Sequence, residues 1–224
     1  MLGLPPGVVA GLFDLDGVLT DTASVHRAAW KQVFEEETGK PFTVADYQLY
    51  VDGKPREDGV RDYLRSLGGE PDEATVKKVA ERKNEVLNRR IADDGVTVFE
   101  GSRRYLEACR DQGIRRAVVS SSANTALVLD VSGLAPLIEL RIDGVTAKEQ
   151  RLAGKPRPDI FLAGARGLEL GAAQCAVFED ALAGVEAGRA GDFGLVVGVD
   201  RVGHAADLLA HGADTVVADL SELL

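Results

Sequence analysis

The sequence predicts an α/β protein whose parallel sheet is interrupted, after its first strand, by a helical insertion. From Val96 onward, short apolar runs typical of buried strands alternate with helical patterns and are separated by glycines, which is the order of parallel βαβ units. One earlier apolar run, at 8–13, precedes a long stretch whose apolar residues recur at helical spacing. We therefore expect an α/β core formed by residues 1–22 and 96–224, and an inserted helical domain at 23–95.

The composition is that of an ordinary globular protein, with 224 residues, 45% of them hydrophobic and 28% charged. A net charge of −10 argues against a general binder of nucleic acids or anionic membranes, although a few local cations can still hold a phosphate. The two cysteines, Cys109 and Cys175, lie outside any metal-ligand spacing, which favours free thiols in a reducing compartment. The pattern contains no signal-like or membrane-spanning segment, so we expect a cytoplasmic protein. We also expect it to be a monomer.

The inserted region is expected to be helical and to contain no strand. Its first helix, at 22–38, places His26 and Trp30 on one face, and a loop carrying 51–56 follows it. The remaining helices are expected at 56–67 and 71–90.

The second part of the core is expected to alternate strands with helices. Strands are predicted at 116–120, 137–142, 175–178, 195–199 and 215–218. Helices are predicted at 101–112, 125–131, 158–168, 181–190 and 204–210.

The first strand ends in two carboxylates, Asp14 and Asp16, followed by Gly17. Side chains two residues apart on an extended backbone point to the same side, so the two acids repel each other and lose solvation together. A neighbouring positive charge, usually a metal ion, would relieve that cost. Taken alone, the pattern is equally compatible with an acidic turn at the end of a strand.

Three further positions carry polar groups at predicted strand ends or loops: Ser120, Lys155 and the pair Glu179–Asp180. Ligands of open parallel sheets bind outside the carboxyl ends of the strands, so these groups should meet the first acidic pair. Each also has a plain structural interpretation, because serines and acids cap helices and a loop lysine is usually solvated.

Together these groups suit phosphoryl transfer. Asp14 can act as nucleophile, and Asp16 can protonate the leaving oxygen and later deprotonate the attacking one. Asp180, with Glu179, completes an all-oxygen magnesium site with the first acidic pair. Ser120 and its neighbouring N–H groups can hold phosphoryl oxygens, and Lys155 supplies a fixed positive charge.

In this order, Asp14–Val18, Ser120, Lys155 and Glu179–Asp180 resemble the four motifs of the haloacid dehalogenase superfamily, and the resemblance covers essentially the whole chain. It implies a Rossmann-like core and Mg²⁺ held by the side chains of Asp14 and Asp180 and by the main-chain carbonyl of Asp16. A helical insertion directly after the first motif resembles the helical-bundle cap type of this superfamily.

The insertion further resembles that of the β-phosphoglucomutases, through the entry Thr22, His26 and Trp30, the loop 53–58 and the helix segment Arg82–Asn84. The segments 120–124 and 155–161 follow the same subfamily's pattern. This implies conversion of β-D-glucose 1-phosphate into glucose 6-phosphate through an aspartyl phosphate and β-glucose 1,6-bisphosphate. The substrate-site candidates are then Gly17, Thr22, His26, Trp30, Gly53, Arg56, Lys83, Ser120, Ser121, Ser122, Asn124 and Lys155, beside Asp14, Asp16, Glu179 and Asp180 at the metal.

Three positions depart from that subfamily: Asp52 stands where a lysine is common, and Gly59 and Ala181 stand where serines are common. The departures leave the sugar open, and Lys54 is a candidate to replace the missing cation. A sugar-phosphate phosphatase is the alternative activity, because the core motifs do not distinguish transfer to water from transfer to sugar. A non-catalytic binding module is the third interpretation, although both Asp14 and Asp16 are intact.

Overall fold

A computed structural model describes residues 2–224. Its centre is a six-stranded sheet in the order β3-β2-β1-β4-β5-β6, in which every neighbouring pair is parallel. The strands are β1 (Ala10–Phe13), β2 (Arg115–Val119), β3 (Leu140–Ile142), β4 (Cys175–Glu179), β5 (Leu195–Val199) and β6 (Thr215–Val217). The predicted α/β class with a parallel sheet is confirmed.

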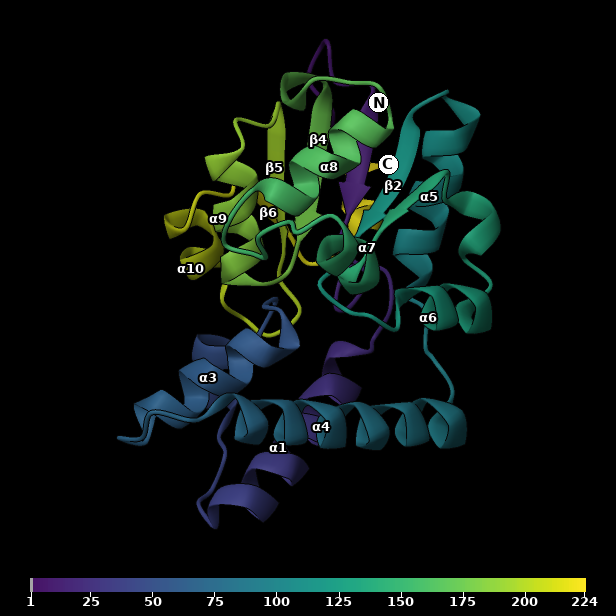
Figure 1. The fold of residues 1–224 in the computed structure, drawn as a ribbon. Coiled ribbons are helices and arrows are strands. Elements are labelled where there is room, and N and C mark those ends of the chain that lie inside the picture. Colours follow the sequence, from purple (N-terminus) through teal and green to yellow (C-terminus); the bar gives the residue numbers. More distant parts are fainter. Residues whose placement is uncertain (1) are drawn as a thin grey trace.

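Helices connect the strands and form the insertion (Figure 1). The insertion holds α1 (Ala23–Thr38), α2 (Val44–Asp46), the π-helix η1 (Tyr47–Val51), α3 (Arg56–Ser66) and α4 (Glu73–Asp94). The core holds α5 (Glu100–Asp111), α6 (Thr125–Ser132), α7 (Gly144–Glu149), α8 (Asp159–Gly167), α9 (Leu182–Ala190) and α10 (Ala205–Ala210). Short 3₁₀ turns, η2 (Ala135–Leu137), η3 (Ala172–Gln174) and η4 (Leu220–Leu223), complete the described chain.

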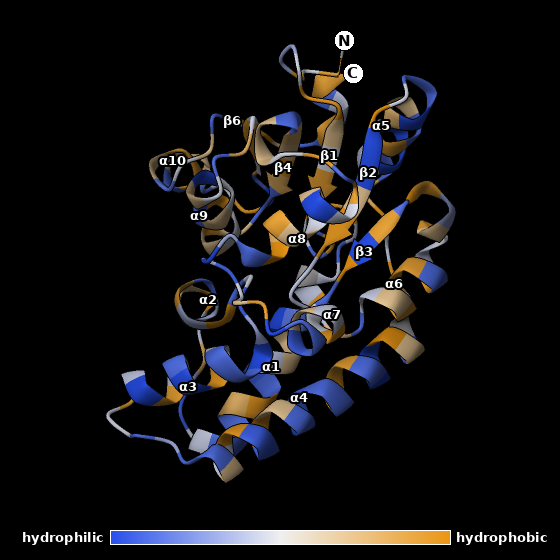
Figure 2. Ribbon diagram, turned by 45° about the horizontal axis from the view of Figure 1, so that its top comes forward, coloured by the Kyte–Doolittle hydropathy of each residue, from blue (hydrophilic) through white to orange (hydrophobic). Residues whose placement is uncertain are grey.

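The sheet is buried on both faces, as expected of parallel strands covered by helices. All four residues of β1 and all five of β4 are buried, and Figure 2 shows these central strands toward the hydrophobic end of the scale. Phe13 and Phe178 stack with ring centroids 4.5 Å apart, and Tyr105 meets Phe178 edge-on at 5.5 Å. This aromatic cluster fixes the two strands that carry the acidic motifs.

Replacing Phe178 with alanine should lower the free energy of unfolding by about 3–5 kcal/mol, because the change leaves a cavity in a fully packed layer. Urea unfolding followed by circular dichroism measures the effect. Leu127→Ala is the matched control, since Leu127 is 44% exposed, and its effect should stay within about 0.5 kcal/mol. Equal losses in the two variants would contradict the described packing.

The insertion has an aromatic core of its own. Phe34 stacks on Trp30 with ring centroids 4.9 Å apart, and its ring also packs against Tyr63 at 4.3 Å and Phe42 at 5.0 Å. Helices α1 to α4 gather beyond one end of the sheet, whereas the two termini lie at the other end (Figure 1). That residues 23–95 move as a separate cap domain stays a prediction.

The segment between α1 and α3 differs from the expected loop. Residues 44–51 are helical, and Thr43 begins α2 by accepting a hydrogen bond from the Asp46 N–H at 3.1 Å while the Asp46 carboxylate accepts one from the Thr43 N–H at 2.8 Å. The prediction of a loop was therefore wrong for these residues, and α7 was not predicted either. The strand expected at 137–142 is shorter, because η2 occupies its first residue.

The sheet order directs attention to one edge. Strands β2 and β3 extend from one side of β1, and β4 to β6 from the other, so the strand order reverses beside β1. Ligands of such sheets bind in the crevice outside the carboxyl ends of the strands at this reversal. No helix among the described residues is long and apolar enough to cross a membrane.

Candidate active site between the sheet and the insertion

Asp14 lies directly after β1, and its N–H continues the sheet by donating to the carbonyl of Phe178 at 3.0 Å. Lys155, fully buried, pairs with the Asp14 carboxylate at 2.5 Å and also with Glu179 at the end of β4. Burial would lower the pKa of Lys155, but the charges of Asp14 and Glu179 together raise it above its ordinary range. Lys155 is therefore a fixed cation between two strand ends.

Three carboxylates meet here, because Asp14, Glu179 and Asp180 each offer an oxygen within 4.8 Å of the others. Burial raises the pKa of Asp14 to about 6 and that of Glu179 to about 7, with Lys155 opposing both shifts. Burial also raises the pKa of Asp180 well above its ordinary range. One lysine does not balance two buried acids and a half-buried third, and an all-oxygen set suits Mg²⁺, so the residues present fit the implied metal.

Gly17 is required by the position of Asp180. A Cβ at Gly17 would lie 1.8 Å from the Asp180 Oδ2 atom, and the backbone φ of 89° is one that other residues rarely adopt. Gly17 therefore allows the first motif to turn against the fourth. Gly17 packs against Asp180 but does not line the pocket described below.

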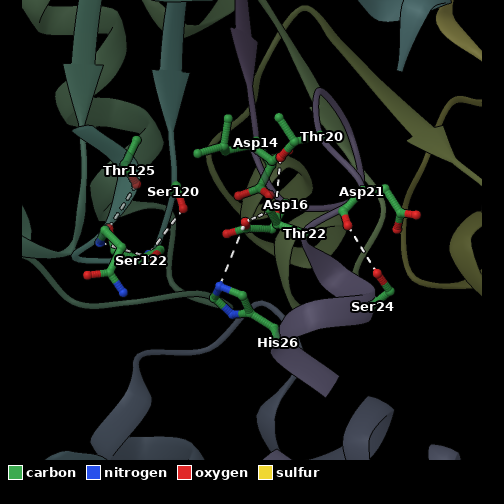
Figure 3. Close-up of polar contacts among 12 residues, drawn as sticks. Asp14, Asp16, Thr20, Asp21, Thr22, Ser24, His26, Ser120, Ser122 and Thr125 are labelled. Atoms are coloured by element: carbon green, nitrogen blue, oxygen red, sulfur yellow. Dashed lines mark hydrogen bonds and ion pairs between the residues drawn. The ribbon is translucent and has the colours of Figure 1, made fainter. Parts of the chain in front are cut away.

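Asp16 faces Thr22 and His26 at the start of the insertion (Figure 3). Its Oδ1 atom accepts a hydrogen bond from the hydroxyl of Thr22 and lies 3.8 Å from the Nε2 atom of His26. The Nδ1 atom of His26 is 3.2 Å from the ammonium of Lys83, which lies 5.0 Å from the centre of the Trp30 ring. A chain of polar contacts thus connects Asp16 with α4.

Burial shapes the charges in this chain. It lowers the pKa of His26 well below the ordinary range, with Lys83 and Arg56 adding to the effect. It lowers the pKa of Lys83 to about 7, and Arg56 contributes again. Lys83 and Arg56 of the insertion therefore repel each other, and an anion bound in the pocket that both residues line would relieve this repulsion.

The loop after β2 contributes both a cradle and a connection to the insertion. The Ser120 hydroxyl accepts a hydrogen bond from the Ser122 N–H at 3.1 Å, which holds the loop in a tight turn. Ser121 donates its hydroxyl hydrogen to the carbonyl of Gly53 at 2.9 Å, and Asn124 donates to the Asn84 side chain at 2.8 Å. Ser121 and Asn124 therefore join the core to the insertion.

These groups enclose a pocket of about 60 Å³. Of the predicted site residues, it is lined by Asp14, Asp16, His26, Trp30, Gly53, Arg56, Lys83, Ser120, Ser121, Ser122 and Asp180. Thr22, Asn124 and Glu179 support these residues without lining the pocket, and Lys155 reaches the neighbouring cleft. That cleft, of about 840 Å³, shares Lys54, Arg56 and Ser121 with the pocket.

Four pocket residues were not among the predicted site residues: Tyr47, Val51, Asp52 and Lys54. Tyr47 and Val51 belong to η1, and Asp52 is the residue after it. The sequence pattern could flag Asp52 only as a departure, and Tyr47 lay in a segment expected to be a loop. Lys54, the candidate replacement cation, lines the pocket edge but pairs with Asp62 at 2.7 Å on α3.

The other two departures also have structural counterparts. A Cβ at Gly59 would lie 3.0 Å from the Val51 side chain, so a serine there would crowd η1. Ala181 is buried, and its Cβ lies 3.0 Å from the place where a Cβ of Gly53 would be. Small residues at both positions allow the η1 segment to lie close to α3 and to the core.

Comparisons with known proteins agree with this geometry. A family model described as haloacid dehalogenase-like hydrolase matches residues 10–192. A β-phosphoglucomutase of Mycobacterium bovis is 53% identical, over 100% of this chain and 94% of that protein. A β-phosphoglucomutase of Bacillus subtilis is 33% identical, over 96% of this chain and 91% of that protein.

Among solved structures, β-phosphoglucomutase from Clostridium difficile superposes with a TM-score of 0.84 at 27% identity, covering 97% of this chain and 93% of that one. The fold, the order of the four motifs and full-length similarity all lead to one assignment. The chain belongs to the haloacid dehalogenase-like hydrolase family, in its β-phosphoglucomutase branch.

Proposed function

We propose that the protein interconverts β-D-glucose 1-phosphate and glucose 6-phosphate, through a phosphoryl group on Asp14 and a β-glucose 1,6-bisphosphate intermediate. The observation that carries the proposal is the pocket in which Asp14 and Asp16 of the core meet His26, Arg56 and Lys83 of the insertion. Similarity to β-phosphoglucomutases over nearly the whole length of both chains supports the same reaction.

Phosphorylated Asp14 gives its phosphoryl group to the C6 hydroxyl of β-glucose 1-phosphate, from which Asp16 removes the proton, and the bisphosphate forms. In the return step, the carboxylate of Asp14 attacks the C1 phosphorus of the bisphosphate, and Asp16 gives its proton to the leaving C1 oxygen, which releases glucose 6-phosphate. The Ser120 hydroxyl and the N–H of Ser121 donate to the phosphoryl oxygens, and Lys155 holds Asp14 in place. Mg²⁺, when bound by Asp14 and Asp180, neutralises charge between the carboxylates and the phosphoryl group.

Two features favour transfer to sugar over transfer to water. The insertion covers Asp14, since Gly53 is held against Ser121 by a hydrogen bond of 2.9 Å. The enclosed pocket of about 60 Å³ is also smaller than the space that small-molecule ligands usually need, about 300–1,000 Å³. The insertion must therefore open to admit a sugar phosphate, and its closure excludes the water that would hydrolyse the aspartyl phosphate.

Arg56 is the proposed partner of the second phosphate. It begins α3 at the boundary between the pocket and the larger cleft, and burial lowers its pKa. Its guanidinium can hold a phosphate through two parallel hydrogen bonds, which a mutase needs because its intermediate carries two phosphates.

Arg56→Ala should weaken substrate binding by about 1.5–3 kcal/mol, the usual contribution of a charge-assisted contact, and appear mainly as a raised KM. Steady-state kinetics with β-glucose 1-phosphate measure the change. Arg82→Ala is the matched control in the insertion, since Arg82 pairs with Glu36 and Glu85 and lines neither the pocket nor the cleft. Unchanged KM and kcat in Arg56→Ala would remove Arg56 from the site.

A coupled assay tests the proposed reaction. The enzyme receives β-glucose 1-phosphate, Mg²⁺ and a trace of the bisphosphate, and glucose 6-phosphate and free phosphate are followed in parallel. We expect glucose 6-phosphate with little free phosphate. Stoichiometric free phosphate without glucose 6-phosphate would replace the proposal with a sugar-phosphate phosphatase.

The cellular setting is a proposal as well. Cys109 and Cys175 are free and buried, which suits a reducing cytoplasm. The monomeric state stays a prediction, which sedimentation of the purified protein would check.

A further inference from the structure

Asp52 is held against the core by the residue that follows it. Gly53 adopts a φ of 67°, its carbonyl accepts the hydrogen bond from Ser121, and its α-carbon lies over Ala181 and Gly184. A side chain at Gly53 would come within 3.0 Å of the Ala181 Cβ, so this close approach requires glycine. The backbone of Asp52 is therefore fixed at the interface between the insertion and the core.

The carboxylate of Asp52 lies inside the site. Asp52 lines the pocket together with Asp14, Asp16 and Asp180, and it also lines a cavity of about 220 Å³ behind them. Burial raises the pKa of Asp52 to about 7, and the side chain of Tyr47 opposes that shift. The Asp52 N–H donates a hydrogen bond to the carbonyl of Tyr47 at 3.0 Å, which fixes the backbone of Asp52. Tyr47 is the first residue of the π-helix η1 and Asp52 follows its last residue, so this short element places both polar residues at the same pocket.

The chemistry of the ligand limits what Asp52 can contact. A carboxylate repels phosphate, so neither phosphate of a bisphosphate is its partner. Among the described residues, the group of oxygens close enough to share a metal consists of Asp14, Glu179 and Asp180, and Asp52 stands outside it. The remaining polar groups of a sugar phosphate are its ring hydroxyls, which donate hydrogen bonds to carboxylates.

We propose that Asp52, positioned by Tyr47, accepts a hydrogen bond from a ring hydroxyl of the sugar and thereby determines which sugar phosphate the enzyme prefers. The inference rests on the proposed function. An ionised carboxylate can only accept hydrogen bonds, so the partner of Asp52 on the sugar is a hydroxyl that donates one.

A double-mutant-type cycle tests the proposal, in which the residue at position 52 is changed and a sugar hydroxyl is removed, separately and together. The wild-type enzyme, Asp52→Asn and Asp52→Ala are compared on β-glucose 1-phosphate and on its 2-, 3- and 4-deoxy analogues, with glucose 6-phosphate or its deoxy counterpart and free phosphate both measured. Glu85→Gln is the matched control, because Glu85 is an exposed carboxylate of the insertion on α4 that contacts Arg82. Thermal unfolding of each variant shows that it is folded.

We expect Asp52→Ala to lower kcat/KM on β-glucose 1-phosphate roughly 10- to 100-fold, the range of a hydrogen bond to a charged group. In the wild-type enzyme, kcat/KM on one deoxy analogue should be lower than on β-glucose 1-phosphate by a similar factor. In Asp52→Ala, kcat/KM on that analogue should equal kcat/KM on β-glucose 1-phosphate. Glu85→Gln should behave as wild type throughout.

The proposal would be overturned if Asp52→Ala lowered kcat/KM, relative to wild type, by the same factor on β-glucose 1-phosphate and on all three analogues. It would also be overturned if Asp52→Ala left kcat/KM unchanged, or if added Mg²⁺ restored the activity of the variant. If wild type releases only free phosphate from every sugar, the proposed mutase function has failed instead. In that case, kcat/KM for the release of free phosphate is compared for the same variants and sugars, and this comparison tests the role of Asp52 independently of the mutase function.

Discussion

Asp14→Asn should lower kcat by about 10⁴-fold or more, the scale seen when a covalent nucleophile is removed. Asparagine has nearly the same shape, but its amide neither attacks phosphorus nor carries the charge that pairs with Lys155. Glucose 6-phosphate formation measures the loss. Mass spectrometry of the protein quenched during turnover should show one added phosphoryl group in wild type and none in the variant.

The control for this variant is the retained fold and substrate binding. Circular dichroism and equilibrium binding of β-glucose 1-phosphate should both resemble those of the wild type. A variant that is folded, binds substrate and turns over at the wild-type rate would show that another residue is the nucleophile.

Asp16→Ala should lower kcat by about 10²–10⁴-fold, the usual contribution of a general acid–base. Its carboxylate faces Thr22 and His26 and lies outside the group formed by Asp14, Glu179 and Asp180. Mg²⁺ binding should therefore persist. Isothermal titration with Mg²⁺, beside steady-state kinetics, separates the two effects.

Glu179→Gln provides the contrast, because Glu179 belongs to the carboxylate group and pairs with Lys155. This variant should bind Mg²⁺ more weakly, whereas Asp16→Ala should not. Wild-type activity in Asp16→Ala, or a loss of Mg²⁺ binding equal to that of Glu179→Gln, would contradict the separate role assigned to Asp16.

The core of the site was predictable because its residues follow strands. Asp14 directly follows one apolar run, and Glu179 ends another. Neighbouring parallel strands have their carboxyl ends at the same edge of the sheet, so the two side chains meet there. The placement of the Ser120 loop and Lys155 near that edge follows from the same topology. Residue type and position along a strand were therefore sufficient for these groups to be expected together.

The insertion was less predictable, because its site residues come from separate helices. His26 and Lys83 meet only through the packing of α1 on α4, and their spacing along the chain carries no sign of the contact of 3.2 Å. Lys83 lies in a helix rich in charged residues, where a lysine is usually solvated, yet it is buried beside Trp30. Tyr47 and Asp52 depend on a π-helix, whose hydrogen-bond pattern has no clear sequence signal.

The central claim is that the closed site delivers the phosphoryl group of Asp14 to a sugar hydroxyl and not to water. The most direct test follows a radiolabelled phosphoryl group from β-glucose 1-phosphate, in the presence of Mg²⁺ and trace bisphosphate, and measures its distribution between products at the end of the reaction. The account predicts that nearly all the label resides in glucose 6-phosphate. Label recovered mainly as inorganic phosphate would contradict it.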